Sequence, residues 1–378
     1  MMNYNNKTIF SLYYLLVVSF LILTNTYFSY DQSLIFGGAD GKSYISISNS
    51  FPNITDQKLM PIHAERFFFY YIFGFLSKFL TIEVYNLYRF FVFLIIGFIN
   101  ILLILILKKK KVEISLILIF LTLINFNPYI SRYYIAIPTI LNDLIFILGI
   151  TLLIYAVENN KNILFILSLL IMFFSRQTSI AIIISLVATK MIFKDDFKIN
   201  LKFIIYSIGI FLLIYLINFY YSSHTFDVKD YRWQQYSIET RIFGFFNESI
   251  DLKKKIIFLT LPFLSYFPLI IFFLIFFSFK NVRKTITNNP NIFFYLMISI
   301  LIILQPVLSG AIITGKNVIR LTTLTYMPVL FIMLNITKKI NLIKGSSTIL
   351  IYIFIIIWSL HPTFSNVKMH ITFKKIIN

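Results

Sequence analysis

The sequence predicts an all-α polytopic membrane protein, a chain that crosses the bilayer many times. Of its 378 residues, 58% are hydrophobic and only 13% are charged, whereas a soluble domain carries about 25% charged residues. Apolar runs of roughly 20 residues recur along the whole chain, and a helix of that length crosses a hydrocarbon core about 30 Å thick. No shift in composition marks a second domain, so we expect one transmembrane domain over residues 1–378.

The distribution of charge and the absence of Cys exclude several kinds of partner and site. The formal net charge is +19, but the basic residues stand mostly in short clusters between apolar runs, such as KKKK at 108–111, as is typical of cytoplasmic loops. We therefore expect membrane lipids and no nucleic acid as partners. The absence of Cys excludes thiolate metal sites, thiol catalysis and disulfides. With only four His, we expect no metal and no other cofactor.

The apolar runs predict about eleven transmembrane helices, together with short interfacial helices in the first outer loop. With Lys7 in the cytoplasm, the first helix at 9–30 leads into an outer loop at 31–65. The run at 66–80 is too short to cross comfortably, so we expect it to lie at the outer interface. The remaining helices are expected at 84–107, 113–127, 138–157, 162–175, 179–193, 201–221, 256–279, 291–307, 319–337 and 347–360, with a second long outer loop at 222–254.

The first outer loop contains FGGADGKSY at 36–44, in which three glycines surround an acid. Glycine permits left-handed backbone conformations and close approach of a ligand, so Asp40 is expected on a tight turn directly above the first helix. Tyr44, a candidate substrate-binding residue, follows four residues later, which is one helical turn on if an interfacial helix starts here. The alternative is that Asp40 caps the N-terminus of an interfacial helix.

The same loop ends in HAERFFFYY at 63–71, where His63 and Arg66 are three residues apart and share one helix face. Arginine binds phosphate through its planar fork, and histidine donates a hydrogen bond or shuttles a proton. The alternative is ordinary anchoring at the interface, with Arg66 reaching the lipid phosphates.

Two later segments also place cations at the outer side. Arg176 lies in FFSRQTS at 173–179, between two short apolar runs, so we expect it to be buried and to need an anion, either a ligand or a structural partner such as Asp143. Lys316 and Arg320 are four residues apart at the start of a late helix. Cations oppose the macrodipole at that end, which favours an anionic ligand there over a loop lysine and an arginine that reaches the surface.

These motifs together resemble a known family. An outer loop with Asp–Gly–x–x–Tyr, followed by His–x–x–Arg at the start of a short aromatic helix, looks like the integral-membrane glycosyltransferases of the GT-C superfamily. SRQTS at 175–179 and GKNVIRLTTLTYMP at 315–328 are similar to segments of bacterial members. The more usual family pattern places a second acid directly after the first, where this chain has Gly41, so the resemblance does not extend to a two-carboxylate or metal-assisted site.

The resemblance implies a function and a place. Family members invert the anomeric centre of a sugar carried on polyprenyl phosphate or diphosphate, with an acid of the first outer loop as general base. Asp40 would be that base, and Arg66, Arg176, Lys316 and Arg320 would hold the donor phosphate. Such an enzyme would sit in the bacterial cytoplasmic membrane, face the exterior, and transfer the sugar to a glycan or lipid acceptor of the cell envelope.

The chemistry of the residues agrees with this interpretation and leaves alternatives open. Glycosyl transfer needs a base for the acceptor hydroxyl and cations for the departing phosphate. In the loop at 222–254, Tyr231 and Trp233 can stack on an acceptor sugar, or the segment can be an amphipathic helix resting on the membrane. A polymerase or ligase of surface polysaccharide would use arginines of that loop, and a flippase or transporter would show repeat symmetry, which the sequence lacks.

Overall fold

The computed structural model describes residues 4–27, 38–225, 238–247, 249–275, 283–284, 286–310, 317–337 and 346–359. All regular secondary structure in these ranges is helical, which confirms the predicted all-α class. Helices occur at all eleven predicted positions: α1 (Tyr4–Tyr27), α5 (Val84–Lys109), α6 (Ile114–Asn125), α8 (Leu141–Asn159), α9 (Asn162–Ser175), α10 (Ile180–Phe193), α11 (Leu201–Thr225), α13 (Leu252–Ile275), α15 (Pro290–Leu308), α17 (Val318–Thr322) continuing into α18 (Tyr326–Thr337), and α19 (Ser346–Ser359). One further helix, α7 (Ser131–Ala136), is not predicted by the sequence, whereas α12 (Ile238–Asn247) lies in the segment 222–254, where an amphipathic helix is one of the two expectations.

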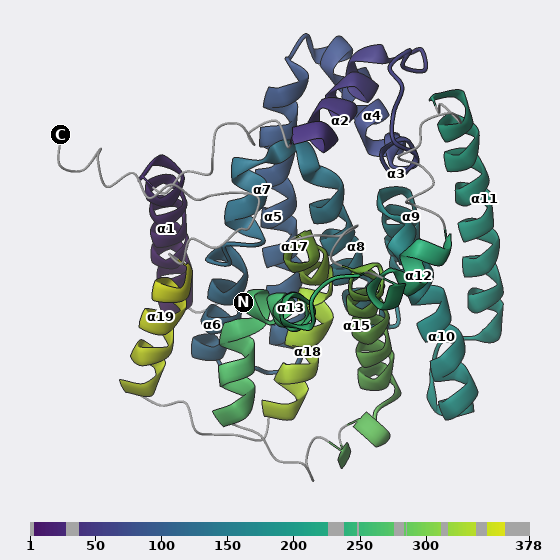
Figure 1. Cartoon of the computed structure of the whole chain (residues 1–378). Helices are drawn as coiled ribbons and strands as arrows, with labels where there is room; N and C mark the ends of the chain where they lie inside the picture. The colour runs from purple at the N-terminus through teal and green to yellow at the C-terminus, as the bar shows by residue number, and fades with distance from the viewer. Residues whose placement is uncertain are drawn as a thin grey trace.

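Within the described ranges, six helical segments are long and apolar enough to cross a membrane: Val84–Lys109, Pro138–Asn159, Leu201–Thr225, Leu252–Ile271, Pro290–Leu308 and Val318–Asn335. Other apolar helices, such as α9 and α6, are shorter. The chain therefore has the character of a multi-pass membrane protein, while the count of eleven crossings stays a prediction. Figure 1 shows α1 and α19 at one edge of the bundle and α11 at the other. The exposed side chains of α11 are largely apolar, as expected for a lipid-facing helix.

The central helix α8 separates two polar ends of the bundle. Its 19 residues span about 28 Å at 1.5 Å per residue, close to the thickness of a hydrocarbon core. Near its C-terminal end, the Glu158 carboxylate pairs with Lys110 Nζ at 3.0 Å, and Lys110 also donates to Asn335 Oδ1 at 3.1 Å. At its N-terminal end, Asn142 Nδ2 donates to the carbonyl oxygen of Arg66 at 3.0 Å. The KKKK turn and the first predicted outer loop thus lie at opposite ends of α8.

Three short helices cover the end that contains Arg66: α2 (Gly38–Ser50), α3 (Pro61–Ala64) and α4 (Phe67–Leu80). They gather at the top of the bundle in Figure 1. The hydroxyl of Ser48 donates to the carbonyl oxygen of Tyr70 at 2.6 Å, and the Tyr44 and Tyr70 rings stack with centroids 4.2 Å apart. These contacts fix α2 on α4. Because α2 begins at Gly38, Asp40 lies inside the first turn of a helix, so the expectation of a tight turn at Asp40 and the alternative of Asp40 as the N-cap are both wrong.

Candidate functional site

The site is built around the carboxylate of Asp40, at the start of α2. Asp40 Oδ1 lies 3.1 Å from His63 Nε2 on α3, and the Asp40 side chain is 32% exposed whereas that of His63 is 5% exposed. The other ring nitrogen of His63, Nδ1, lies 3.1 Å from Ser43 Oγ, one turn along α2 from Asp40. The imidazole is therefore held from both sides and orients the carboxylate.

The surroundings of Asp40 favour its charged form. Burial by itself raises the pKa of this carboxyl, but the hydrogen bond and electrostatic attraction of His63 and the positive charges of Arg320 and Arg66 outweigh burial and hold the pKa well below its usual range. The folded protein therefore keeps Asp40 as a carboxylate at neutral pH. A carboxylate of this kind accepts hydrogen bonds and can accept a proton.

Two arginines approach from other helices and share one buried acid. Arg320 Nη2 of α17 lies 3.7 Å from Asp40 Oδ2, and Arg320 Nε lies 3.5 Å from Asp143 Oδ2 of α8. Arg176, which ends α9, pairs through Nη1 with Asp143 Oδ1. The Nε groups of Arg176 and Arg320 are buried and have no partner of hydrogen-bond geometry among the described residues. Such unsatisfied donors are uncommon and call for an explanation.

Arg66 is held by neutral groups. Its Nη1 donates to the Tyr44 hydroxyl at 3.2 Å and its Nε donates to Gln177 Oε1 at 3.4 Å. Gln177 in turn donates through Nε2 to Glu65 Oε2 at 2.6 Å. Tyr44 is buried behind Arg66 and does not line the cavity, so it positions the guanidinium from behind.

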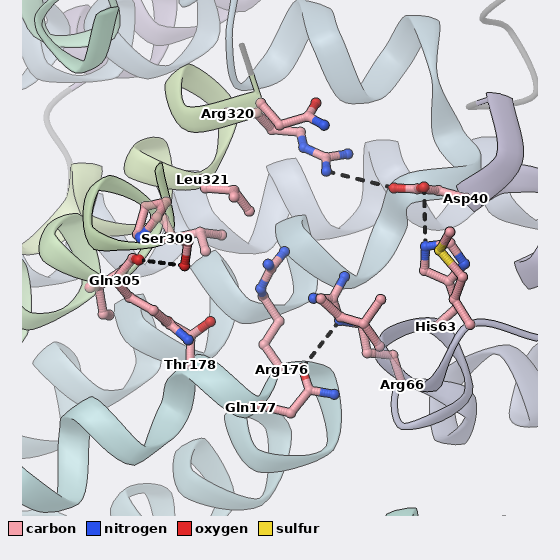
Figure 2. Close-up of a pocket in the computed structure, with 16 residues that line it drawn as sticks. Asp40, His63, Arg66, Arg176, Gln177, Thr178, Gln305, Ser309, Arg320 and Leu321 are labelled. Carbon is pink, nitrogen blue, oxygen red and sulfur yellow. Dashed lines mark hydrogen bonds and ion pairs between the residues drawn. The ribbon is translucent and has the colours of Figure 1, made fainter. Parts of the chain in front are cut away.

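These residues surround a cavity of about 240 Å³. Figure 2 shows Asp40 between His63 and Arg320, with Arg66 and Arg176 nearby. Besides Arg320, the residues that α15 and the segment 317–324 contribute to the lining are neutral polar or apolar. The full lining is Asp40, Met60, Ile62, His63, Arg66, Arg176, Gln177, Thr178, Ile302, Gln305, Pro306, Ser309, Asn317, Arg320, Leu321 and Leu324. The wall thus carries three arginines and one aspartate, with Asp143 buried behind it.

Five of the nine residues predicted from the sequence come together here: Asp40, His63, Arg66, Arg176 and Arg320. Lys316, Tyr231 and Trp233 lie outside the described residues. In the part of the chain that the structure describes, no three His, Asp or Glu side chains are grouped so that they could hold a metal ion.

Sequence reasoning overlooks some contributors to the site. Gln177 is adjacent to Arg176 but gives no signal of its own, because single amides are common in polar turns. The sequence suggests Asp143 only as a partner of Arg176, and its contact with Arg320 joins residues 177 positions apart in the chain. The signal for Asp143 is its place in the first turn of an apolar helix, where a charged side chain is costly unless it is paired.

The comparisons with known proteins do not place the chain in a family. No family model matches the sequence, and neither a curated protein nor a solved structure is found to match it. The function therefore has to be argued from the site itself.

Proposed function

We propose that this chain is an inverting glycosyltransferase that takes its sugar from a polyprenyl phosphate or diphosphate donor. The observation that carries the proposal is the cavity in which one carboxylate, Asp40, faces three arginines, Arg66, Arg176 and Arg320. In this proposal the fold is of the GT-C kind with eleven transmembrane helices. The cavity opens on the outer face of a bacterial cytoplasmic membrane, and the acceptor is a cell-envelope glycan or lipid.

The unsatisfied donors point to an anionic ligand. The Nε groups of Arg176 and Arg320 are buried without a hydrogen-bond partner among the described residues, and an unmade hydrogen bond of a buried charged group costs about 1–3 kcal/mol or more. A phosphate oxygen in the cavity would accept from the guanidinium N–H groups of the three arginines that line it. Arginine is suited to this role because its planar fork presents parallel N–H groups to phosphate.

The residues fit the steps of glycosyl transfer. The acceptor hydroxyl oxygen attacks C1 of the sugar, the bond from C1 to the phosphate oxygen breaks, and its electron pair leaves with the lipid phosphate. Asp40 takes the acceptor proton, and the arginines stabilise the charge on the departing phosphate. Because Asp40 has a lowered pKa, it is a weak base and takes the proton late, after the new bond to C1 has begun to form. Stabilisation of the leaving phosphate then carries much of the catalysis.

The other wall of the cavity suits a donor with a lipid part. Ile302 and Pro306 of α15 and Leu321 and Leu324 near α17 present apolar surface beside the arginines. A volume of about 240 Å³ is below the roughly 300–1,000 Å³ of sites for drug-sized ligands, so the cavity admits one sugar and its phosphate. The lipid chain would leave between helices toward the bilayer.

Transfer of radiolabelled sugar from polyprenyl-phosphate and polyprenyl-diphosphate donors in membranes tests the proposal. Asp40→Asn keeps the shape and one acceptor oxygen but removes the base, and we expect transfer to fall about 10²–10⁴-fold at equal protein level. Asp56→Asn is the matched control, because Asp56 is an exposed acid of the same segment that does not line the cavity. No transfer by the wild type from either donor, or full transfer by Asp40→Asn, would overturn the proposal.

A further inference from the structure

A second, smaller cavity lies at the opposite end of α8, away from Asp40. It measures about 70 Å³ and forms where the end of α8, the starts of α9 and α11, and the start of α15 converge. A pocket made by four helix ends is a defined feature of the fold, unlike a single exposed side chain. It shares no residue with the candidate active site, so a ligand bound here does not depend on the proposed transferase activity.

The pocket has positive charge that no acid neutralises. Lys161 and Lys198 both line it, and neither forms an ion pair with a carboxylate in the part of the chain that the structure describes. The nearby Glu158 is already engaged, since it pairs with Lys110 at 3.0 Å and accepts from the Tyr295 hydroxyl at 3.0 Å. Two lysines from different loops that line one small cavity favour an anion there.

Amide groups add hydrogen-bond donors to the same pocket. Asn160, Asn162 and Asn291 line it, and their side chains form no hydrogen bond with other described residues. Asn160 has a left-handed backbone with φ of 51°, which ends α8 and turns the chain back into α9 within three residues. The turn brings Asn160, Lys161 and Asn162 to one side of the cavity. Ammonium and amide donors together match a phosphate group.

Exposed apolar residues stand next to the lining residues on two helices. The rings of Phe165 and Phe203 meet edge to face at its floor, with centroids 6.3 Å apart. Ile163, next to the lining residue Asn162, is 82% exposed, and Leu201, between the lining residues Ile199 and Phe203, is 57% exposed. In a membrane protein such exposed faces contact acyl chains. A ligand with a phosphate and hydrocarbon chains would satisfy both parts of the surface.

We propose that this pocket binds the phosphate of an anionic phospholipid, whose acyl chains lie against α9 and α11. Basic pockets between transmembrane helices are known to hold such head groups. A free phosphate would use the same lysines and amides, but it would leave the exposed apolar faces without a role. The lipid is therefore the occupant that accounts for the whole surface.

Binding of phosphatidylglycerol and phosphatidylcholine to the full purified chain in detergent, followed by native mass spectrometry, tests the proposal. We expect preferential retention of phosphatidylglycerol by the wild type and about 30-fold weaker retention by Lys161→Gln/Lys198→Gln, since each lysine near an anionic lipid adds roughly fivefold. Lys202→Gln is the matched control, because Lys202 is an exposed lysine at the start of α11 outside the pocket. The single variants serve if the double variant fails to fold.

Three results would overturn the proposal. The first is equal retention of the two lipids by the wild type. The second is unchanged retention of phosphatidylglycerol by the double variant or by both single variants. The third is displacement of the lipid by millimolar inorganic phosphate in the wild type, which would assign the pocket to soluble phosphate and leave the lipid without a role.

Discussion

Removal of the Asp143 carboxylate is the perturbation whose effect the structure defines best. Asp143 is only 1% exposed and faces two arginines, Arg176 through Oδ1 and Arg320 through Oδ2. Asp143→Asn keeps the shape of the side chain but leaves Arg176 buried without a counter-charge and Arg320 with Asp40 alone. Breaking a buried ion pair by removing one partner costs about 3–5 kcal/mol, so we expect a loss of that size in the free energy of unfolding.

A double-mutant cycle separates the charge effect from general damage. Arg176→Gln removes the cation that Asp143→Asn leaves without a counter-charge. Because residues in contact couple by about 0.5–3 kcal/mol, the double variant should be at least about 1 kcal/mol more stable than Asp143→Asn. Glu83→Gln is the control, because Glu83 is an exposed acid at the start of α5, and such surface changes usually stay within about 0.5 kcal/mol. Denaturant unfolding of the purified chain in detergent measures the stability of every variant against the wild type.

The activity of the same variants tests the role of the arginines. The double variant is expected to recover stability but lacks one of the arginines proposed to bind phosphate, so its transfer should stay far below that of the wild type. An Asp143→Asn protein as stable as the wild type, or a double variant no more stable than Asp143→Asn, would refute the reasoning that Asp143 balances the buried arginines.

Two further predictions concern Asp40 and the helix that carries it. Because the folded pKa of Asp40 is lowered, the carboxylate is protonated only as pH falls below the ordinary value of about 3.9. The loss of transfer activity at acid pH that is due to Asp40 should therefore lie below about pH 4, and it should move to higher pH in His63→Gln. A pH–rate profile that does not move in this variant would contradict the prediction. A Cβ at Gly74 would clash with the backbone carbonyl oxygen of Ser48, whereas one at Gly97 meets nothing within 4 Å. Gly74→Ala should therefore separate α2 from α4, destabilise the chain by about 1–3 kcal/mol and reduce transfer. Gly97→Ala should be neutral or stabilising. Equal denaturant unfolding curves for the two variants would show that the close contact at Gly74 is unimportant.

The helices are predictable from the sequence because their signal is local. An apolar run of sufficient length has few alternatives to a helix in a membrane, and runs such as 162–175 coincide with the helices of the structure. The sequence does not predict the helix α7, because Ser131–Ala136 is short and lies between two longer apolar segments. Its six residues give too little periodic pattern to distinguish a helix from a turn.

The site is predictable in its members but not in its contacts. Asp40, His63 and Arg66 stand out as polar residues at the edge of apolar segments, where charge is costly. The sequence cannot show which face of α2 points inward, because GADGKSYISISNS has few apolar residues to mark a buried side. Tyr44, a substrate-binding candidate from the Asp–Gly–x–x–Tyr pattern, is buried and accepts a hydrogen bond from Arg66, a contact that this pattern does not indicate.

The two polar ends of α8 show why the end with Asp40 is the better candidate for function. Lys110 and Glu158 form a pair of one cation and one anion at 3.0 Å, and the remaining groups of both side chains find neutral partners. Such a cluster is complete and needs no ligand to explain it. The other end buries Arg176 and Arg320 with Nε groups that lack a hydrogen-bond partner among the described residues, beside a cavity. Desolvated cations are unfavourable by several kcal/mol each unless they are compensated, and here Asp143 and Asp40 compensate Arg176 and Arg320 beside a cavity that can still admit an anion, which is why the proposed function is placed at this end.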